Sequence, residues 1–412
     1  MEFIADFHIH SKYSRATSRD MDVEHIARWA KLKGVTLMGT GDFTHHLWLE
    51  ELKANLQDLG NGLFKHQDTY FILSAEISSI YSKKGRTYRI HNIVLSPSFK
   101  TTDKINATLA RYGNLASDGR PILGMDAREL TRIIFDIDEN CMVIPGHIWT
   151  PWFSLFGSMS GFDRIEDCFE EQTPKIFALE TGLSSDPAMN WRLSALDRFS
   201  LVSNSDSHSP SKIGREANVF DCEFSYAALR EVLRTKDKKK FLYTIEFFPE
   251  EGKYHFDGHR LCNIRLSPVQ TKEHQGLCPK CGKPVTVGVM NRIERLADRP
   301  NGFVPSQAIP YKNLIPLEEI MAEAKGVNKG SVAVEREYLA TVAKFGNEFN
   351  ILVRAQEDEL FKGLPRRLAE GVLRMRQAKV EVQPGFDGEY GKILVFGSSE
   401  IKNKEEEQLS LF

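Results

Sequence analysis

The chain has 412 residues, and its 54 Lys and Arg against 56 Asp and Glu give a formal charge of −2. This length allows two to four domains, and 41% hydrophobic with 27% charged residues excludes a disordered or collagen-like chain. No window holds the ~18 uninterrupted apolar residues of a membrane span, and the N-terminal MEFIAD lacks the features of a signal peptide. We therefore expect a cytoplasmic protein with no membrane partner, and the balanced charge gives no hint of nucleic-acid binding.

The first half of the chain alternates β-rich runs with amphipathic segments. The β-rich runs are 3–10, 36–42, 70–77, 89–96, 141–148, 176–182 and 199–206. The helix-like segments between several of them are 22–33, 126–137 and 187–197. Such alternation is typical of βαβ units and a parallel sheet. The pattern predicts an α/β fold, either a closed barrel or an open doubly wound sheet.

Nearly every predicted strand ends on a residue that can bind a metal ion. These residues are His8, His10, Asp42, Glu76, His91, His147, Glu180, Asp206 and His208. Barrel enzymes carry their chemistry at the C-terminal ends of the strands, so the series favours the barrel. Alternate residues of a strand share a face, so His8 and His10 can bind one ion together. The weaker interpretation of each histidine is an ordinary core or surface residue.

Three of the six cysteines lie within 20 residues of one another. The count is too low for a disulfide scaffold, and the cluster indicates a metal. His259-x2-Cys262 and Cys278-x2-Cys281 form two short hooks that can converge tetrahedrally on one zinc ion. Four protein ligands leave no open position, so we predict a structural zinc. Two other histidines are alternatives to His259 as the fourth ligand: His255 and His274.

Composition divides the chain into four predicted parts. A Pro- and Gly-containing linker follows the cysteines at 299–310, and three amphipathic, helix-like segments follow the linker. These segments are 316–325, 331–345 and 364–377. The predicted parts are a barrel (1–240), a zinc-binding domain (241–300), a helical domain (301–397) and a flexible polar tail (398–412).

The order of the motifs resembles the polymerase-and-histidinol-phosphatase (PHP) superfamily of metal-dependent phosphoesterases. The opening HIHS, the glycine-flanked Asp42, the isolated acids and histidines, and the closing Asp206-Ser207-His208 carry the resemblance, which covers residues 1 to about 215. It implies a distorted (β/α)7 barrel that holds up to three metal ions. The implied ligands are His8, His10, Glu76 and Asp206 for one ion, Glu76, His91 and His147 for a second, and Asp42 and His208 for a third. Asp42, Glu76 and Asp206 are the implied catalytic carboxylates.

The sequence departs from the superfamily pattern at two places. Phe43 stands where many members have a histidine directly after the aspartate of the second motif. Tyr13, Ser14 and Arg15 occupy a region in which another ligand histidine is usual. Both departures affect the third ion, for which His45 is an alternative ligand.

The predicted centre suits phosphoester hydrolysis. Clustered divalent ions lower the pKa of bound water and neutralise the charge that develops on phosphate. Histidine and carboxylate ligands suit zinc, with magnesium or manganese as alternatives. Candidate DNA-binding residues near the motifs are Arg15, Arg89, Lys212 and Arg215, together with Trp149 and Trp152, which could stack on an extruded base. The alternative for each is a packed or solvated structural residue.

The whole chain resembles a narrower group, the endonuclease Q family of DNA repair nucleases. The stretches that match are HSKYSRA, GKYHFDGHRLC with CPKCGK and RIERLADRP, and FDGEYGKI. The resemblance implies cleavage of double-stranded DNA 5′ to uracil, hypoxanthine, xanthine or an abasic site, and a DNA-binding role for the helical domain. Two other functions remain: a small-molecule phosphatase such as a histidinol-phosphate hydrolase, and a non-catalytic DNA-damage binding protein. The preferred lesion and the oligomeric state stay open.

The chain ends in a short motif after an acidic stretch. Gln408, Leu409, Leu411 and Phe412, within QLSLF, match the pentapeptide that binds the bacterial sliding clamp. The motif predicts clamp binding, a bacterial source and a place near the nucleoid.

Overall fold

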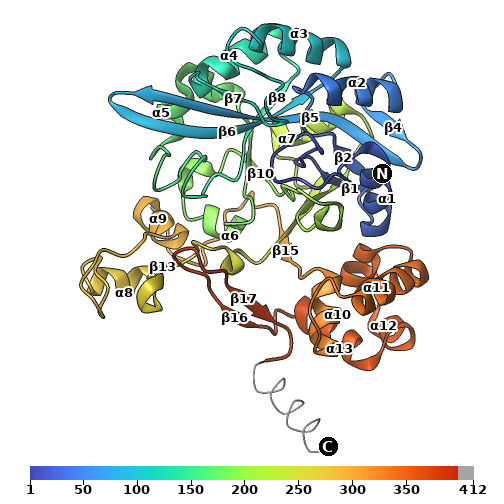
Figure 1. The fold of residues 1–412 in the computed structure, drawn as a ribbon, viewed down its shortest axis with the longest axis vertical. Coiled ribbons are helices and arrows are strands. Elements are labelled where there is room, and N and C mark those ends of the chain that lie inside the picture. The colour runs from blue at the N-terminus through green and yellow to red at the C-terminus, as the bar shows by residue number, and fades with distance from the viewer. Residues whose placement is uncertain (398–412) are drawn as a thin grey trace, which may run out of the picture.

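The computed structural model describes residues 1–397, so the predicted clamp-binding residues lie outside the described residues. Figure 1 shows a large α/β body, mostly from the N-terminal half, at the top. Two regions lie below it: a small region around α8 and α9 on the left and a helical region on the right. Within residues 1–397, no helix combines the length and apolar composition of a membrane span.

The large body is built on a mixed sheet. Its main strands are β1 (Glu2–Asp6), β2 (Leu37–Gly39), β5 (Thr69–Lys83), β6 (Arg86–Ser96), β8 (Met142–Pro145), β11 (Ala217–Asp221), β12 (Phe241–Glu246) and β15 (Tyr311–Asn313). They run in the order β15-β12-β11-β1-β2-β5-β6-β8. Short strands β3 (Gln57–Asp58), β4 (Phe64–His66) and β7 (Ile122–Leu123) join the same sheet, while β9 (Ala178–Glu180) and β10 (Ser200–Val202) form a separate parallel pair. The predicted α/β class is confirmed.

The sheet is mixed because β11 runs antiparallel to β1 and β12, and because β5 and β6 form a hairpin. β1, β2 and β5 are parallel, but β6 runs antiparallel to β5, and β8 antiparallel to β6. The sequence predicted strands at 70–77 and 89–96 within a parallel sheet. In the structure both strands continue to a two-residue turn at Lys84 and Gly85, which both have positive φ, as tight hairpins require.

Helices surround the sheet at its faces and ends. They are α1 (Val23–Lys33), α2 (His46–Asn55), α3 (Phe99–Leu109), α4 (Ala127–Ile137), α5 (Ile165–Phe169), α6 (Pro187–Asn190) and α7 (Tyr226–Thr235). Short 3-10 turns lie at Glu170–Lys175, Ser194–Leu196, Pro210–Lys212, Pro249–Glu251 and Arg260–Cys262. The predicted helix at 22–33 shows why such segments form. Asp22 caps its first turn by accepting from the His25 N–H, and Gly34 ends it at φ +90°.

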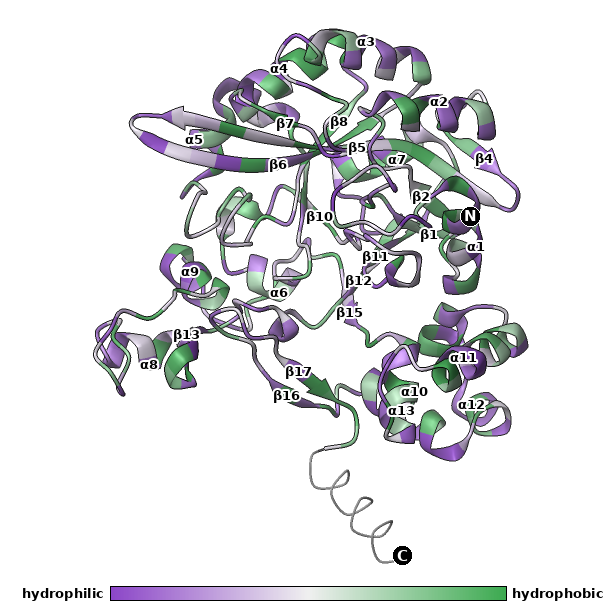
Figure 2. Ribbon diagram, viewed as in Figure 1, coloured by the Kyte–Doolittle hydropathy of each residue, from purple (hydrophilic) through white to green (hydrophobic). Residues whose placement is uncertain are grey.

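The remaining regions pack beside this body. The small region holds β13 (Asp257–His259), β14 (Ile264–Leu266), α8 (Pro268–Glu273) and α9 (Val289–Leu296). The helical region holds α10 (Leu317–Lys325), α11 (Val332–Phe345), a π-helical turn (Asn350–Arg354), α12 (Glu357–Gly363) and α13 (Arg366–Arg376). Figure 2 shows hydrophobic and hydrophilic residues alternating along α10 to α13, as expected for amphipathic helices. A buried ion pair, Lys33 Nζ to Glu348 Oε2 at 2.5 Å, joins this region to α1.

The chain then returns to the small region through a hairpin of β16 (Glu381–Gln383) and β17 (Lys392–Leu394). Phe256 N–H donates to the Gly385 carbonyl. Asp387 accepts from the Arg260 N–H and the Thr286 hydroxyl. The hairpin therefore ties the helical region to the cysteine-bearing region.

Candidate active site

The fold gathers predicted ligands from strands that are far apart in the sequence. Seven of the eight predicted ligands fall into three overlapping groups whose ligand atoms lie within 4.8 Å of one another. The groups are His8, His10 and Glu76; His10, Asp206 and His208; and Glu76, His91 and His147. They lie at or near the C-terminal ends of β1, β8 and β10 and in the middle of the β5–β6 hairpin.

Glu76 lies at the centre of these groups. Its Oε1 is 2.5 Å from His91 Nδ1 and 3.0 Å from His147 Nε2. Its Oε2 is 3.5 Å from His8 Nε2 and 3.3 Å from His10 Nε2. Although burial opposes it, His91 and His8 hold the pKa of Glu76 well below its usual value. One carboxylate thus faces two histidine pairs, which is the arrangement of a bridging ligand.

Several buried polar atoms at this centre have no hydrogen-bond partner among the described residues. They are His8 Nε2, His10 Nε2 and Asp206 Oδ1. His10 Nε2 is 3.1 Å from Asp206 Oδ1, and His8 Nε2 is 3.7 Å from it. Unpaired buried nitrogen and oxygen atoms are costly, and a shared cation would satisfy all three. The donor set therefore fits a divalent metal.

A carboxylate orients His8 from behind. Glu180 accepts at 3.0 and 3.2 Å from His8 Nδ1, so His8 Nε2 faces the centre. Glu180 also accepts from the His147 N–H at 2.7 Å and from Asn204 Nδ2 at 2.9 Å. Such carboxylate–histidine pairs fix the ring and raise its basicity as a ligand. The sequence marked Glu180 as a strand end but assigned it no role.

Asp42 plays the same part for His10 and lies outside the three groups. Its Oδ1 is 3.1 Å from His10 Nδ1. Its Oδ2 accepts from the Ser11 N–H and hydroxyl, both at 2.6 Å, and from the Ser14 hydroxyl at 2.9 Å. The family resemblance implied that Asp42 binds a third ion together with His208. In the structure Asp42 instead accepts hydrogen bonds from Ser11 and Ser14 and lies outside the group that contains His208.

His45, the alternative ligand for a third ion, is also outside the groups. Its ring stacks on Tyr13 with the centroids 4.5 Å apart. Burial is the main reason that its pKa lies below the usual value. In contrast, His208 joins His10 and Asp206, so the third group depends on His208 and not on Asp42 or His45.

A cavity of about 440 Å³ opens above the centre, within the range of ligand pockets. His91, His147 and Asp206 line it beside Arg120 and Trp152. Arg120 Nη1 is 3.2 Å from Glu76 Oε2. The sequence analysis missed Arg120 because it follows no predicted strand and belongs to no motif.

Three of the predicted DNA-binding residues line or flank this cavity. Arg15 has a 79% exposed side chain and contacts Asp118 at 3.4 Å. Trp152 lines the cavity wall. The Arg89 guanidinium lies over the Phe153 ring, 5.5 Å from its centroid.

The other three predicted DNA-binding residues have structural partners. Trp149 is 1% exposed, and its indole N–H donates to Asn190 Oδ1 at 2.8 Å. The prediction that Trp149 stacks on an extruded base is therefore wrong, because its ring is buried. Lys212 pairs with Glu318 and Glu319 on α10. Arg215 donates to the Ser205 carbonyl at 2.9 Å and supports the backbone before Asp206.

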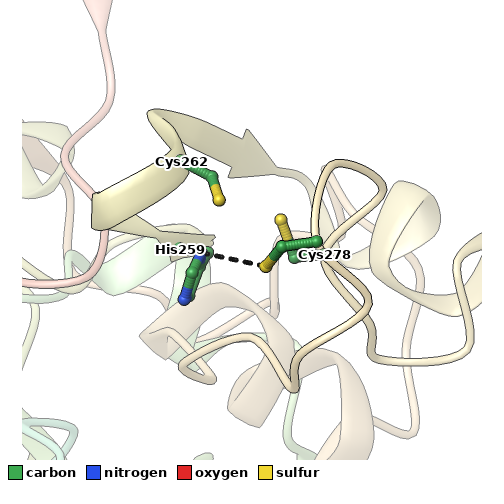
Figure 3. A group of neighbouring side chains, drawn as sticks. His259, Cys262 and Cys278 are labelled. Atoms are coloured by element: carbon green, nitrogen blue, oxygen red, sulfur yellow. Dashed lines mark hydrogen bonds between the residues drawn. The ribbon is translucent and has the colours of Figure 1, made fainter.

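The second cluster is the cysteine group of the small region. His259, Cys262, Cys278 and Cys281 place one ligand atom each within 4.8 Å of one another, and Figure 3 shows His259, Cys262 and Cys278 converging. Cys281 Sγ is 3.7 Å from His259 Nδ1. Although burial opposes it, the N–H groups of Lys280 and Cys281 lower the pKa of Cys278, which favours the thiolate that metals bind.

The alternative fourth ligands lie outside this cluster. His255 is buried, and burial lowers its pKa to about 4. His274 ends α8 as its C-cap. Neither belongs to the group of four, so the predicted choice of His259 agrees with the geometry.

Comparisons with known proteins match the helical region and, for some relatives, most of the chain. The family described as the MJ0043 C-terminal domain matches residues 316–379. The uncharacterized protein MJ0043 of Methanocaldococcus jannaschii is 33% identical over 266 residues, which is 62% of this chain and 33% of that protein. This chain therefore spans about a third of that relative's length. The uncharacterized protein YqxK of Bacillus subtilis is 28% identical over 410 residues, covering 94% of this chain and 98% of that protein.

Two solved structures match over nearly the full length. The lesion-specific endonuclease PfuEndoQ from Pyrococcus furiosus has a TM-score of 0.87 at 30% identity, covering 100% of this chain and 99% of that one. Endonuclease Q in complex with a 27-mer duplex that has an abasic lesion at the active site has a TM-score of 0.85 at 30% identity, covering 98% of each chain.

Proposed function

Because the chain belongs to the endonuclease Q family, we propose that it hydrolyses a DNA phosphodiester on the 5′ side of a damaged base. It is a nuclease, a hydrolase acting on DNA. The full-length match to the lesion-specific enzyme carries the proposal. The proposed substrates are duplexes with uracil, hypoxanthine, xanthine or an abasic site, the last being the lesion in the related complex.

The metal ligands follow from the three groups of side chains. Glu76 would bridge two ions, one bound by His8, His10 and Asp206 and the other by His91 and His147. His208 would serve a third ion together with His10 and Asp206. Zinc, magnesium or manganese, when bound, would supply an acidic water and neutralise charge on the phosphate.

The chain's own residues orient this centre and the substrate. Glu180 and Asp42 hold His8 and His10 with Nε2 facing inward. Burial lowers the pKa of His91, which favours the neutral ring that a metal ligand needs. Arg120, beside Glu76 at the cavity wall, would hold a phosphate oxygen through its remaining N–H groups.

We infer that the strands of the large body form the distorted seven-stranded barrel implied by the sequence. The candidates are β1, β2, β5, β6, β8, β9 and β10. Ile148 N–H donates to the Glu180 carbonyl between the ends of β8 and β9. A parallel bridge pairs Ile9 with Ser207 beyond β1 and β10. These contacts support a ring in which the β5–β6 hairpin replaces one βαβ unit.

The cysteine cluster would hold a structural zinc ion. Three thiolates and one imidazole complete a tetrahedral shell with no open position. Asn263 directly after Cys262 and Gly282 directly after Cys281 have positive φ, so the chain reverses after each hook. β12 and β15 belong to the sheet of the large body, so the proposed zinc-binding region begins after β12 and the proposed helical region after β15.

The full-length match favours the nuclease over the small-molecule phosphatase, because a phosphatase leaves the small and helical regions without a role. A non-catalytic binding protein was suggested by the missing histidines. Seven grouped ligands support catalysis instead.

Labelled duplexes with deoxyuridine, deoxyinosine or an abasic site test the proposal directly. We expect a metal-dependent nick 5′ to at least one lesion, no nick in the undamaged duplex, and no nick with a chelator. Absence of a nick beside every lesion would refute the proposal, as would much faster turnover of a phosphomonoester.

We further propose that the tail binds the bacterial sliding clamp through Gln408, Leu409, Leu411 and Phe412, residues outside the described part of the chain. Removing residues 408–412 should abolish co-elution with the clamp and leave nicking of a short duplex unchanged. Retained co-elution would contradict this role.

A further inference from the structure

Beyond the metal centre, β5 and β6 continue as a two-stranded ribbon, defined here as residues 77–90. Figure 1 shows it projecting from the large body. The cross-strand pairs along it are Ser78 with His91, Ile80 with Arg89, and Ser82 with Thr87. It ends in the turn at Lys84 and Gly85.

Both edges of the ribbon are occupied near its base. β7 pairs with Ser78 and Ser79 on the β5 side. On the β6 side, the Arg89 N–H donates to the Ser160 carbonyl and the His91 N–H to the Phe153 carbonyl. A partner therefore cannot add as a further strand there, and only the two faces of the ribbon remain.

One face is covered by the body of the protein. Tyr88 stacks on Phe162 with the ring centroids 3.8 Å apart. Lys83 Nζ is 2.5 Å from Glu170 Oε1 and donates to the Asp167 carbonyl. Arg86, which pairs across the strands with Lys83, lies over the Tyr88 ring, 5.3 Å from its centroid. Both basic side chains of this face therefore have partners within the protein.

The opposite face of the ribbon begins at the metal-binding residues and extends away from them. Side chains alternate along a strand, so Glu76 and Ser78 share a face with Ile80 and Ser82, and His91 shares it with Arg89 and Thr87. Ser78 and His91 line the active-site cavity. Farther out, Ser82 and Thr87 on this face are exposed, as is Lys84 in the turn at the tip. Within residues 1–397, these three side chains have no hydrogen-bond or ion-pair partner.

All charged side chains of the ribbon are basic. Residues 77–90 contain Lys83, Lys84, Arg86 and Arg89 and no Asp or Glu. Figure 2 shows hydrophilic residues along its outer part. From Ser78 to Lys84 the ribbon spans about 20 Å at ~3.3 Å per residue, which corresponds to roughly six base pairs along the axis of a DNA duplex.

We propose that the open face of the ribbon binds the phosphate backbone of the DNA duplex on one side of the cleavage site. This inference rests on the proposed nuclease function. Arg89 and Lys84 supply positive charge near and far from the metal centre, and the Ser82 and Thr87 hydroxyls donate to phosphate oxygens. Such contacts fix register and orientation and carry no base specificity.

Two adjacent lysines provide a matched test, because Lys84 is free and Lys83 is ion-paired on the covered face. Binding of the full-length protein to lesion-containing and undamaged duplexes is measured over a range of salt concentrations. For Lys84→Gln we expect affinity to fall about 3- to 10-fold for both duplexes and the salt slope to fall by about 1. The single-turnover rate at saturating protein should not change. Lys83→Gln should match the wild type in both binding quantities.

Shortening the duplex gives a second measurement. The difference in binding affinity between the wild type and Lys84→Gln should vanish when one arm of the duplex is shortened to fewer than about six base pairs beyond the lesion. The difference should persist when the other arm is shortened.

The inference is overturned if Lys84→Gln binds like the wild type with the same salt slope, or if both lysine variants lose affinity equally. A wild-type protein that nicks no lesion would instead refute the proposed function, so the two failures are distinguishable.

Discussion

The two ligand clusters of this protein are built on opposite plans. The cysteine cluster takes its four side chains from the 23 residues 259–281, and Cys281 is exposed. The cluster of the large α/β body takes its side chains from positions 8 to 208, and Glu76 and both histidines of the opening motif are buried. A local hook can form from sequence spacing alone, whereas a dispersed cluster exists only after the large body has folded.

The clusters also differ in what surrounds the ligands. The barrel histidines are held from behind by Glu180 and Asp42 and face a cavity of about 440 Å³. The cysteine cluster has four soft or imidazole donors and needs no cavity. A metal held by the first cluster would face the cavity and leave room for a substrate, whereas four protein ligands in the second cluster would close a tetrahedral shell.

The largest expected effect is on the bridging carboxylate of the barrel. Glu76→Gln should reduce lesion nicking below detection, because the neutral amide neither bridges two ions nor offsets their positive charge. The measurement is single-turnover nicking, with metal content determined in parallel and circular dichroism as the folding control. Nicking within tenfold of the wild type would exclude Glu76 as the bridging ligand.

A smaller effect is expected from the residue behind His8. Glu180→Gln should weaken metal affinity by about 10- to 100-fold, the usual cost of losing such an orienting partner. Titrating nicking activity with metal checks this, and activity should recover at high metal concentration. A loss that no metal concentration restores would make Glu180 a ligand rather than an orienting residue.

A substitution in the cysteine cluster should change local structure and leave the metal ions of the other cluster bound. Cys278→Ser should lose one equivalent of metal, and the segment 255–285 should become sensitive to protease, while the barrel ions stay bound. Elemental analysis after dialysis and limited proteolysis measure both quantities. Cys141→Ala, a change at a buried cysteine outside the cluster, should keep the full metal content. Loss of barrel metal in Cys278→Ser would show that the two clusters are coupled.

The smallest effect concerns two buried carboxylates at β11 and β12 of the large body that lack histidine partners. Burial raises the pKa of Glu246 to about 8 and that of Glu216 well above its usual value. Because the folded-state pKa is raised, their stabilisation is complete below about pH 4.5 and is lost as the pH rises through about 8. Glu246→Gln should therefore raise Tm at pH 8.5 by about 2–4 °C and flatten its pH dependence.

Thermal unfolding between pH 5 and 9 measures this, with Glu223→Gln as the exposed control. An equal slope of Tm against pH in the variant and the wild type would show that Glu246 does not titrate on unfolding.

Local features were readable from the sequence. The His-x-His strand, the two cysteine hooks and the helices at 22–33 and 331–345 depend on spacing, capping and alternation within short segments. The predicted choice of His259 followed from the same local logic and agrees with the geometry.

Only the tertiary structure decided which residues meet. The orienting role of Glu180, the capture of Asp42 by Ser11 and Ser14, and the place of Arg120 beside Glu76 depend on contacts between distant segments. Trp149 looked like an exposed aromatic beside a metal site and is instead core, because burial depends on what packs above a loop.

The charge and chemistry of the ligands were thus set by the sequence, since residue type and local spacing determine which ions a side chain can bind. The folded α/β body decided which of these side chains face the cavity and which support them from behind. The physical reason is that orientation and burial arise from packing between strands that the sequence separates by up to two hundred positions.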